Sequence, residues 1–207
     1  MKIVAATKIL KANERLADEN RAALDAAGVF GVNIVGSPGC GKTTMLEALF
    51  ARLGDRLALG VIEGDIASSI DAQRIDALGV PVVQINTDGA CHLDAAMISA
   101  AAANLDLDAI DLLAVENVGN LVCTAGFDLG EHLRLVLLSV PEGDDKIAKY
   151  PAIFQGSDAL VVTKTDLLPH FDFKVDRVAA DMKHLAPQAK VFEISATTGH
   201  GMEQLGG

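Results

Sequence analysis

The sequence has few aromatic residues, few cysteines and no strongly basic segment. Only 4% of its 207 residues are aromatic and none is tryptophan, so aliphatic side chains must fill most of the core of a chain that is 50% hydrophobic. The formal net charge of −11 opposes binding to nucleic acid or to an anionic membrane surface. We therefore expect neither nucleic acid nor a membrane as a partner.

The three cysteines are an odd number without a C-x-x-C pair, which predicts no disulfide framework and favours a reducing cytoplasm. The apolar stretch at residues 1–7 is too short for a signal peptide, and no apolar run approaches the length of a membrane span. We expect a cytoplasmic protein in which residues 1–207 form a single domain of ordinary size.

Apolar periodicity predicts alternating strands and helices. Residues 8–27 carry one apolar helical stripe that Gly28 ends, so residues 1–28 should hold a helix that packs on the flank of a sheet or, alternatively, binds a partner. Aliphatic runs typical of buried strands lie at residues 30–35, 57–62, 80–85, 112–115, 133–138, 159–162 and 190–194, and helical patterns at 44–50, 69–78, 92–103, 173–185 and 201–205. This order predicts a three-layer α/β fold with a mainly parallel central sheet flanked by helices.

A glycine-rich loop joins the first strand to the next helix. It reads Gly36-Ser37-Pro38-Gly39-Cys40-Gly41-Lys42-Thr43 and completes G-x-x-x-x-G-K-[ST], the P-loop motif. Backbone N–H groups and a helix N-terminus there attract phosphates, while Lys42 would hold the β- and γ-phosphates and Thr43 would ligate Mg²⁺. We assign nucleotide contacts to Gly36, Gly39, Cys40, Gly41, Lys42, Thr43 and Thr44, although Cys40 fills a free position of the motif.

Two later segments select the base. Thr163-Lys164-Thr165-Asp166 ends a buried strand and is similar to the N-K-x-D guanine signature, with Thr163 in place of asparagine. The Asp166 carboxylate can accept both N1–H and the exocyclic amino group of guanine, whereas adenine would leave it unpaired at a cost of about 1–3 kcal/mol. Ser195-Ala196 follows the last strand and would place backbone groups at guanine O6. Either segment alone could be a turn, but together they predict GTP rather than ATP.

Two acids at strand ends are candidates for Mg²⁺ binding and catalysis. Glu63-Gly64-Asp65 ends the second strand, and Glu116 begins an E-x-x-G variant of the D-x-x-G switch in which Gly119 could sense the γ-phosphate. Because strand ends and the P-loop share the carboxyl edge of the sheet, Asp65 and Glu116 are predicted to act with Lys42 in catalysis. Each acid could instead cap a turn, and no residue identifies itself as a catalytic base.

Cys91-His92 and Cys123 follow other strands that end at this edge. Thiolate and imidazole are ligand types that Zn²⁺ and Ni²⁺ favour, but this spacing is also met by cysteines that only fill a core. Two copies of a sparse ligand set across a two-fold axis could complete a metal site.

The ordered motifs closely resemble those of the HypB family, the hydrogenase nickel-incorporation GTPases of the SIMIBI class. They are the P-loop, Glu63-Gly64-Asp65, Cys91-His92, Glu116-Asn117-Val118-Gly119-Asn120-Leu121-Val122-Cys123 and Val140-Pro141-Glu142-Gly143-Asp144-Asp145-Lys146. The resemblance implies a metallochaperone that hydrolyses GTP while nickel enters the large subunit of [NiFe]-hydrogenase, with a HypA-type partner. It also implies a homodimer formed on GTP binding, whose interface holds nickel or zinc on Cys91, His92 and Cys123.

Many family members also carry an N-terminal cysteine motif or a histidine-rich stretch for nickel. The first cysteine here is Cys40, so we expect neither feature and assign nickel handling to the interface site and the partner. Three alternatives are a urease-type nickel GTPase, a GTPase chaperone of a cobalamin enzyme, and a nucleotide-gated metal-binding adaptor with little turnover. The urease type carries Cys-Pro-His where this chain has Cys-His, and the cobalamin type would not need the cysteines.

Overall fold

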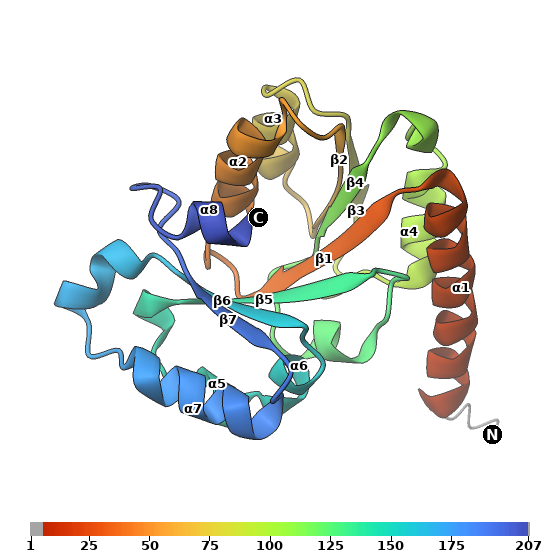
Figure 1. Ribbon diagram of the computed structural model, residues 1–207. Helices are drawn as coiled ribbons and strands as arrows, with labels where there is room; N and C mark the ends of the chain where they lie inside the picture. The colour runs from red at the N-terminus through yellow and green to blue at the C-terminus, as the bar shows by residue number, and fades with distance from the viewer. Residues whose placement is uncertain (1–5, 207) are drawn as a thin grey trace.

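The computed structural model describes residues 6–206, in which a seven-stranded sheet is covered by helices on both faces (Figure 1). The strands are β1 (Phe30–Gly36), β2 (Leu59–Asp65), β3 (Val82–Asn86), β4 (Leu112–Glu116), β5 (Leu133–Ser139), β6 (Ala159–Thr163) and β7 (Lys190–Glu193). Their order is β3-β2-β4-β1-β5-β6-β7 and every neighbouring pair is parallel. The predicted three-layer α/β fold is confirmed.

The helices of the described chain lie in two layers, as Figure 1 shows. One face is covered by α2 (Lys42–Leu53), α3 (Ile70–Asp76) and α8 (Met202–Leu205). The other is covered by α1 (Ala6–Ala27), α4 (Ala95–Ala102), α5 (Lys146–Lys149), α6 (Pro151–Gln155) and α7 (Val175–Leu185). No helix among residues 6–206 has both the length and the apolar character needed to cross a membrane.

Strand side chains alternate between these two layers, which explains the nearly continuous aliphatic runs. On β5, Leu135 and Leu137 pack toward α2, whereas Val136 and Leu138 pack toward α6 and α7. A sheet buried on both faces needs apolar residues at successive positions, as parallel sheets do. The core therefore consists of two aliphatic layers separated by one sheet.

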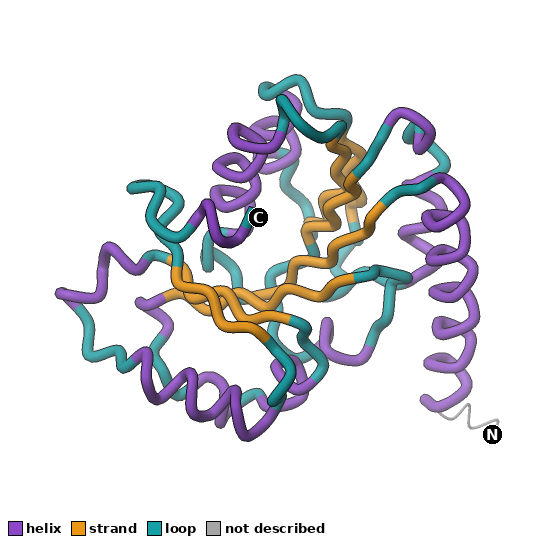
Figure 2. The backbone as a smooth tube through the Cα atoms, viewed as in Figure 1, coloured by secondary structure: helices purple, strands orange, loops and turns teal. Residues whose placement is uncertain are grey.

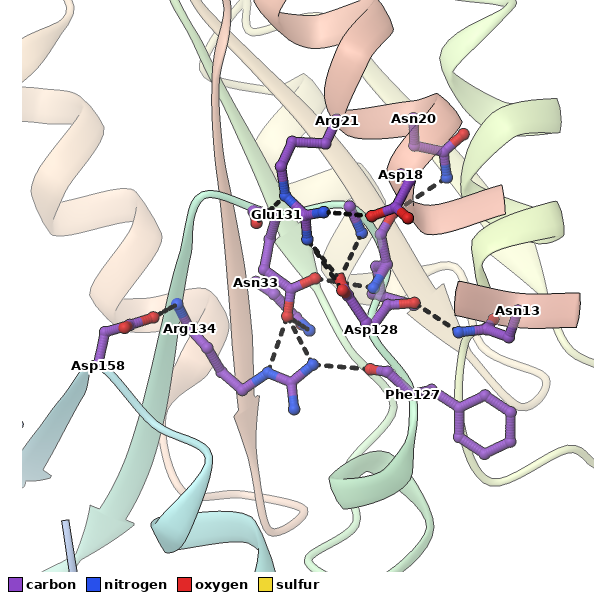
Figure 3. A network of polar contacts seen from close by, with 12 residues as sticks. Asn13, Asp18, Asn20, Arg21, Asn33, Phe127, Asp128, Glu131, Arg134 and Asp158 are labelled. Atoms are coloured by element: carbon purple, nitrogen blue, oxygen red, sulfur yellow. Dashed lines mark hydrogen bonds and ion pairs between the residues drawn. The ribbon is translucent and has the colours of Figure 1, made fainter. Parts of the chain in front are cut away.

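The N-terminal helix α1 is joined to the sheet by a polar network (Figure 3). Arg21 donates to both carboxylate oxygens of Asp128 at 2.9 Å, and Asn20 Nδ2 donates to the carbonyl oxygens of Ala95 and Leu129 at 2.8 and 3.0 Å. Since Asn20 is buried, these bonds fix both the position and the rotation of the helix. Helix α1 thus lies on the flank of the sheet in this structure, and residues 1–5 lie outside the described chain.

Helix α4 differs from its predicted start at residue 92, because it begins only at Ala95. Asp94 is its N-cap, with an extended backbone and a side chain that accepts a hydrogen bond from Met97 N at 2.8 Å. Capping side chains compete with helix continuation, so the helix begins after Asp94. Cys91 and His92 consequently lie in a loop at the carboxyl edge of the sheet. The short helices α5 and α6 were not predicted.

Candidate nucleotide and metal site

The P-loop lies between β1 and α2, in the context that its motif predicts (Figure 2). Gly39 and Gly41 have φ angles of 71° and 99°, in the left-handed region that glycine adopts without steric cost. Helix α2 begins directly afterwards at Lys42, so its free N–H groups point to the same loop. This arrangement can bind phosphate groups.

Behind the loop, Lys42 and Thr43 face Glu116 at the end of β4. Thr43 Oγ1 donates to Glu116 Oε1 at 2.9 Å, and Lys42 Nζ lies 4.0 Å from the same oxygen. The Glu116 side chain is buried, and its Oε2 atom has no hydrogen-bond partner among the described residues. Burial raises the pKa of Glu116 to about 7, although Lys42 and Thr43 act in the opposite direction. The predicted approach of Glu116 to the P-loop is found.

Glu63 is a functional candidate that the sequence reasoning missed. Parallel register places it beside Glu116 on neighbouring strands, and its side chain is only 2% exposed. Its Oε2 atom also lacks a partner in the described chain. Burial, followed by the charge of Glu116, raises the pKa of Glu63 to about 8. Two adjacent buried carboxyl groups, each with an oxygen that has no partner in the described chain, fit a divalent cation. The sequence feature that could have pointed to Glu63 is its place as the first acid of Glu63-Gly64-Asp65.

Asp65, the acid that the sequence favoured on β2, has other partners in this structure. Its Oδ1 atom accepts the backbone N–H groups of Ala67 and Ser68 at 2.8 and 2.6 Å. The side chain therefore holds the turn after β2, as the alternative interpretation of this acid supposed. Its Oδ2 atom takes no part in these two bonds.

A pocket of about 220 Å³ lies beside the P-loop, where a base would be expected. It is lined by Gly41, Thr44, Met45, Thr163, Lys164, Asp166, Leu167, Ile194, Ala196 and Thr197. Thr44 from the P-loop helix and Asp166 from the T-K-x-D segment thus meet at one cavity. The Asp166 side chain is exposed, so the penalty for an unpaired carboxylate arises only when a base covers it.

The residues next to Asp166 support the P-loop from behind. Thr163 Oγ1 donates to the carbonyl oxygen of Cys40 at 2.6 Å, and Lys164 Nζ donates to that of Gly39 at 2.6 Å. Threonine in place of asparagine therefore still ties the T-K-x-D segment to the loop. Cys40 is fully buried, and burial raises the pKa of its thiol to about 11, so it is a packing residue.

Of the pair Ser195-Ala196, only Ala196 lines the pocket. Ser195 is buried, its backbone N–H donates to His200 O at 3.0 Å, and its Oγ accepts from Thr198 N at 3.2 Å. Ser195 therefore shapes the loop that places Ala196 at this pocket.

Cys91 and Cys123 meet at the carboxyl edge although 32 residues separate them in sequence. Their Cα atoms are 6.1 Å apart and their sulfur atoms form a disulfide. The expectation of no disulfide was therefore wrong, because it considered local spacing and not the sheet order that brings these two loops together. A disulfide has no thiolate to offer a metal, so these sulfurs can act as ligands only after reduction.

His92 has its ring stacked on Phe127, with centroids 3.9 Å apart, and its Nδ1 atom lies 3.9 Å from Cys91 Sγ. Within residues 6–206 no group of three or more His, Cys, Asp or Glu side chains is arranged to hold a metal ion. A single chain thus brings together the two cysteines with the histidine alongside, and a complete site would need ligands from elsewhere.

The parallel sheet, the glycine loop with its lysine and threonine, and the adjoining base pocket define a P-loop nucleotide-binding domain. The family model described as CobW/HypB/UreG, nucleotide-binding domain, matches residues 31–193. The chain belongs to this family, and within it to the HypB family.

Individual relatives agree with this assignment. The chain is 50% identical over 194 residues to the hydrogenase maturation factor HypB of Azotobacter vinelandii, covering 94% of this chain and 64% of that protein. It is 42% identical to a probable hydrogenase maturation factor HypB of Methanocaldococcus jannaschii, covering 97% and 90% respectively. A crystal structure of HypB from Helicobacter pylori in complex with nickel superposes with a TM-score of 0.90 at 42% identity, covering 94% of this chain and 92% of that one.

Proposed function

We propose that the chain is a GTP-hydrolysing nickel metallochaperone that acts in [NiFe]-hydrogenase maturation. Its nucleotide state would control homodimerisation and thereby the assembly of a nickel or zinc site at the dimer interface. The observation that carries the proposal is the contact between Cys91 and Cys123 on the sheet edge that also bears the P-loop. Its similarity to a HypB that was crystallised with nickel supports the choice of metal.

The nucleotide half of the proposal depends on the groups around Glu116. Lys42 and the loop N–H groups would bind the β- and γ-phosphates, and Asp166 would select guanine. Thr43, Glu116 and Asp65 would hold Mg²⁺, which neutralises charge on the phosphates. The Oε2 atom of Glu116, which has no hydrogen-bond partner within residues 6–206, fits such a cation. No residue of the sequence identifies itself as a catalytic base, so a second subunit would supply the groups needed for fast GTP hydrolysis.

The metal half requires reduced cysteines. In a cytoplasmic setting, Cys91 and Cys123 would be free to bind Ni²⁺ or Zn²⁺ together with His92. Two such sets across a dimer axis would complete a soft-ligand site. Delivery to the hydrogenase large subunit, with a HypA-type partner, would follow when GTP hydrolysis separates the subunits.

The test measures mass and metal binding in the same reduced protein. Sedimentation velocity with GDP and with a non-hydrolysable GTP analogue should give a monomer and a dimer respectively. Equilibrium dialysis with Ni²⁺ should show at least ~10-fold weaker binding for Cys91→Ala and Cys123→Ala, with GTP affinity nearly unchanged. His184→Ala, at an exposed histidine of α7, is the matched control.

Either of two results would contradict the proposal. One is the same mass with both nucleotides, which removes the nucleotide-controlled dimer. The other is undiminished nickel affinity in both cysteine variants, which removes the ligand set.

A further inference from the structure

Residues 116–120, which begin with the last residue of β4, contact both the P-loop and the two cysteine loops. Asn117 is 1% exposed, and its Oδ1 atom accepts the backbone N–H groups of Leu93 at 3.2 Å and Val118 at 2.9 Å. Leu93 is buried and lies two residues after Cys91. The amide of Asn117 therefore fixes the end of the Cys91 loop against the end of β4.

The orientation of this amide is itself held by buried neighbours. Asn117 Nδ2 donates to Asn33 Oδ1 at 3.3 Å, and Asn33 Nδ2 donates to Glu131 Oε1 at 3.1 Å. Glu131 Oε1 also accepts a hydrogen bond from Arg134 Nε at 2.8 Å (Figure 3). If the Asn117 amide were rotated by half a turn, its NH₂ group would face the N–H group of Leu93 and its oxygen would face Asn33 Oδ1. Only the observed orientation therefore satisfies these groups.

Asn120 fixes the Cys123 loop by hydrogen bonds, as Asn117 fixes the Cys91 loop. Its Oδ1 atom accepts the backbone N–H groups of Val122 and Cys123 at 2.6 and 2.8 Å. Its own backbone N–H donates to the carbonyl oxygen of Gly36, the first glycine of the P-loop, at 2.9 Å. One residue thus links the start of the phosphate loop to the second cysteine.

The same segment is packed tightly against the phosphate site. A Cβ atom at Gly119 would lie 2.8 Å from the backbone N and Cα atoms of Pro38, so the two backbones are already in contact. Glu116, the first residue of the segment, holds Thr43. Nucleotide binding must engage Lys42 and Thr43, and any resulting shift of the loop reaches residues 116–120 through these contacts.

We infer that Asn117 and Asn120 are the positioning residues that couple nucleotide state to the geometry of the Cys91 and Cys123 pair. The inference rests on the proposed function, in which both ligands bind this edge. Asn120 would carry displacement of the P-loop to Cys123, and Asn117 would hold the Cys91 loop to the same segment. Neither residue would touch the nucleotide or the metal.

This arrangement makes a quantitative demand. A coupling between two sites is a ratio of affinities, typically about 5-fold to 150-fold, and it must be the same whichever ligand is varied. Loss of a positioning residue should therefore reduce the ratio of metal affinities in the two nucleotide states. Loss of a metal-ligating residue would instead reduce the metal affinity in every nucleotide state.

The experiment measures Zn²⁺ affinity of the reduced chain by chelator competition, once with GDP and once with a non-hydrolysable GTP analogue. The unsubstituted protein should give a ratio of at least ~5 between the two dissociation constants. Asn120→Ala should lower the ratio to below ~2, while nucleotide affinity without metal changes by less than ~3-fold. Asn120→Asp retains an acceptor for the two N–H groups and should restore most of the ratio.

Asn117→Ala should lower the ratio of dissociation constants in the same way, and thermal unfolding checks that this variant folds. If Asn117→Ala does not fold, the result for Asn120→Ala decides the test. Asn104→Ala is the matched control, since Asn104 is exposed and its side chain donates to Ala100 O at the end of α4. An unaltered ratio in folded Asn120→Ala overturns the inference and leaves the proposed function standing. A ratio near 1 in the unsubstituted protein overturns both.

Discussion

The buried carboxyl pair Glu63 and Glu116 predicts an unusual dependence of stability on pH. Burial raises the pKa of Glu63 to about 8, far above the value of about 4.3 for a glutamate in an unfolded chain. The folded protein therefore keeps a proton that the unfolded chain releases. Because the native state binds more protons, the free energy of unfolding falls as pH rises from about 4.3 to about 8.

The size of this loss follows from linkage. One retained proton changes the free energy of unfolding by about 1.4 kcal/mol per pH unit, which integrates to about 2 kcal/mol between pH 6 and pH 8. For a chain of this length that is a decrease in Tm of about 4–8 °C.

The assay is thermal unfolding at pH 6, 7 and 8 without nucleotide and with a chelator. Glu63→Gln removes the titrating group, so its Tm should change less with pH than that of the unsubstituted protein. Glu203→Gln, at an exposed glutamate of α8, should follow the unsubstituted protein. Superimposable pH profiles for the unsubstituted protein and Glu63→Gln would refute the assignment of a retained proton to Glu63.

Three further predictions concern the nucleotide. Lys42→Ala should weaken GTP binding by about 10-fold to 100-fold, from loss of charged hydrogen bonds, and calorimetry that finds unchanged affinity would remove the P-loop argument. Asp166→Asn should shift preference from GTP toward xanthosine triphosphate, whose C2 oxygen accepts the new amide donor, and competition binding checks this; retained GTP preference counts against Asp166. Gly119→Ala places a Cβ atom 2.8 Å from the Pro38 backbone, so it should weaken nucleotide binding and lower Tm, and normal values in titration and unfolding would disprove the contact.

The local parts of the site could be predicted from sequence because each is a short, continuous motif. The P-loop needs glycines at fixed positions between a strand and a helix, and Gly39 and Gly41 have the positive φ angles that this requires. Glu116 was placed beside the P-loop because it ends a strand, and the structure bonds it to Thr43. Aliphatic runs at successive positions likewise required a sheet covered on both faces.

What the sequence could not decide depends on contacts between distant segments. Choosing Glu63 over Asp65 required the register of β2 against β4, which places Glu63 next to Glu116. The prediction of no disulfide was wrong because Cys91 and Cys123 are distant in sequence. They come together only because β3 and β4 both lie beside β2 in the sheet.

The sequence by itself determined the class of fold and the phosphate-binding motif, and it supplied the candidate residues for guanine and metal binding, since these reside in the chemistry of adjacent residues. Tertiary structure alone decided which groups are neighbours, and therefore that Asn117 and Asn120 tie both cysteine loops to the phosphate loop. The physical reason is that a hydrogen bond forms only within about 3 Å, and the strand order of the sheet sets which groups come within that distance.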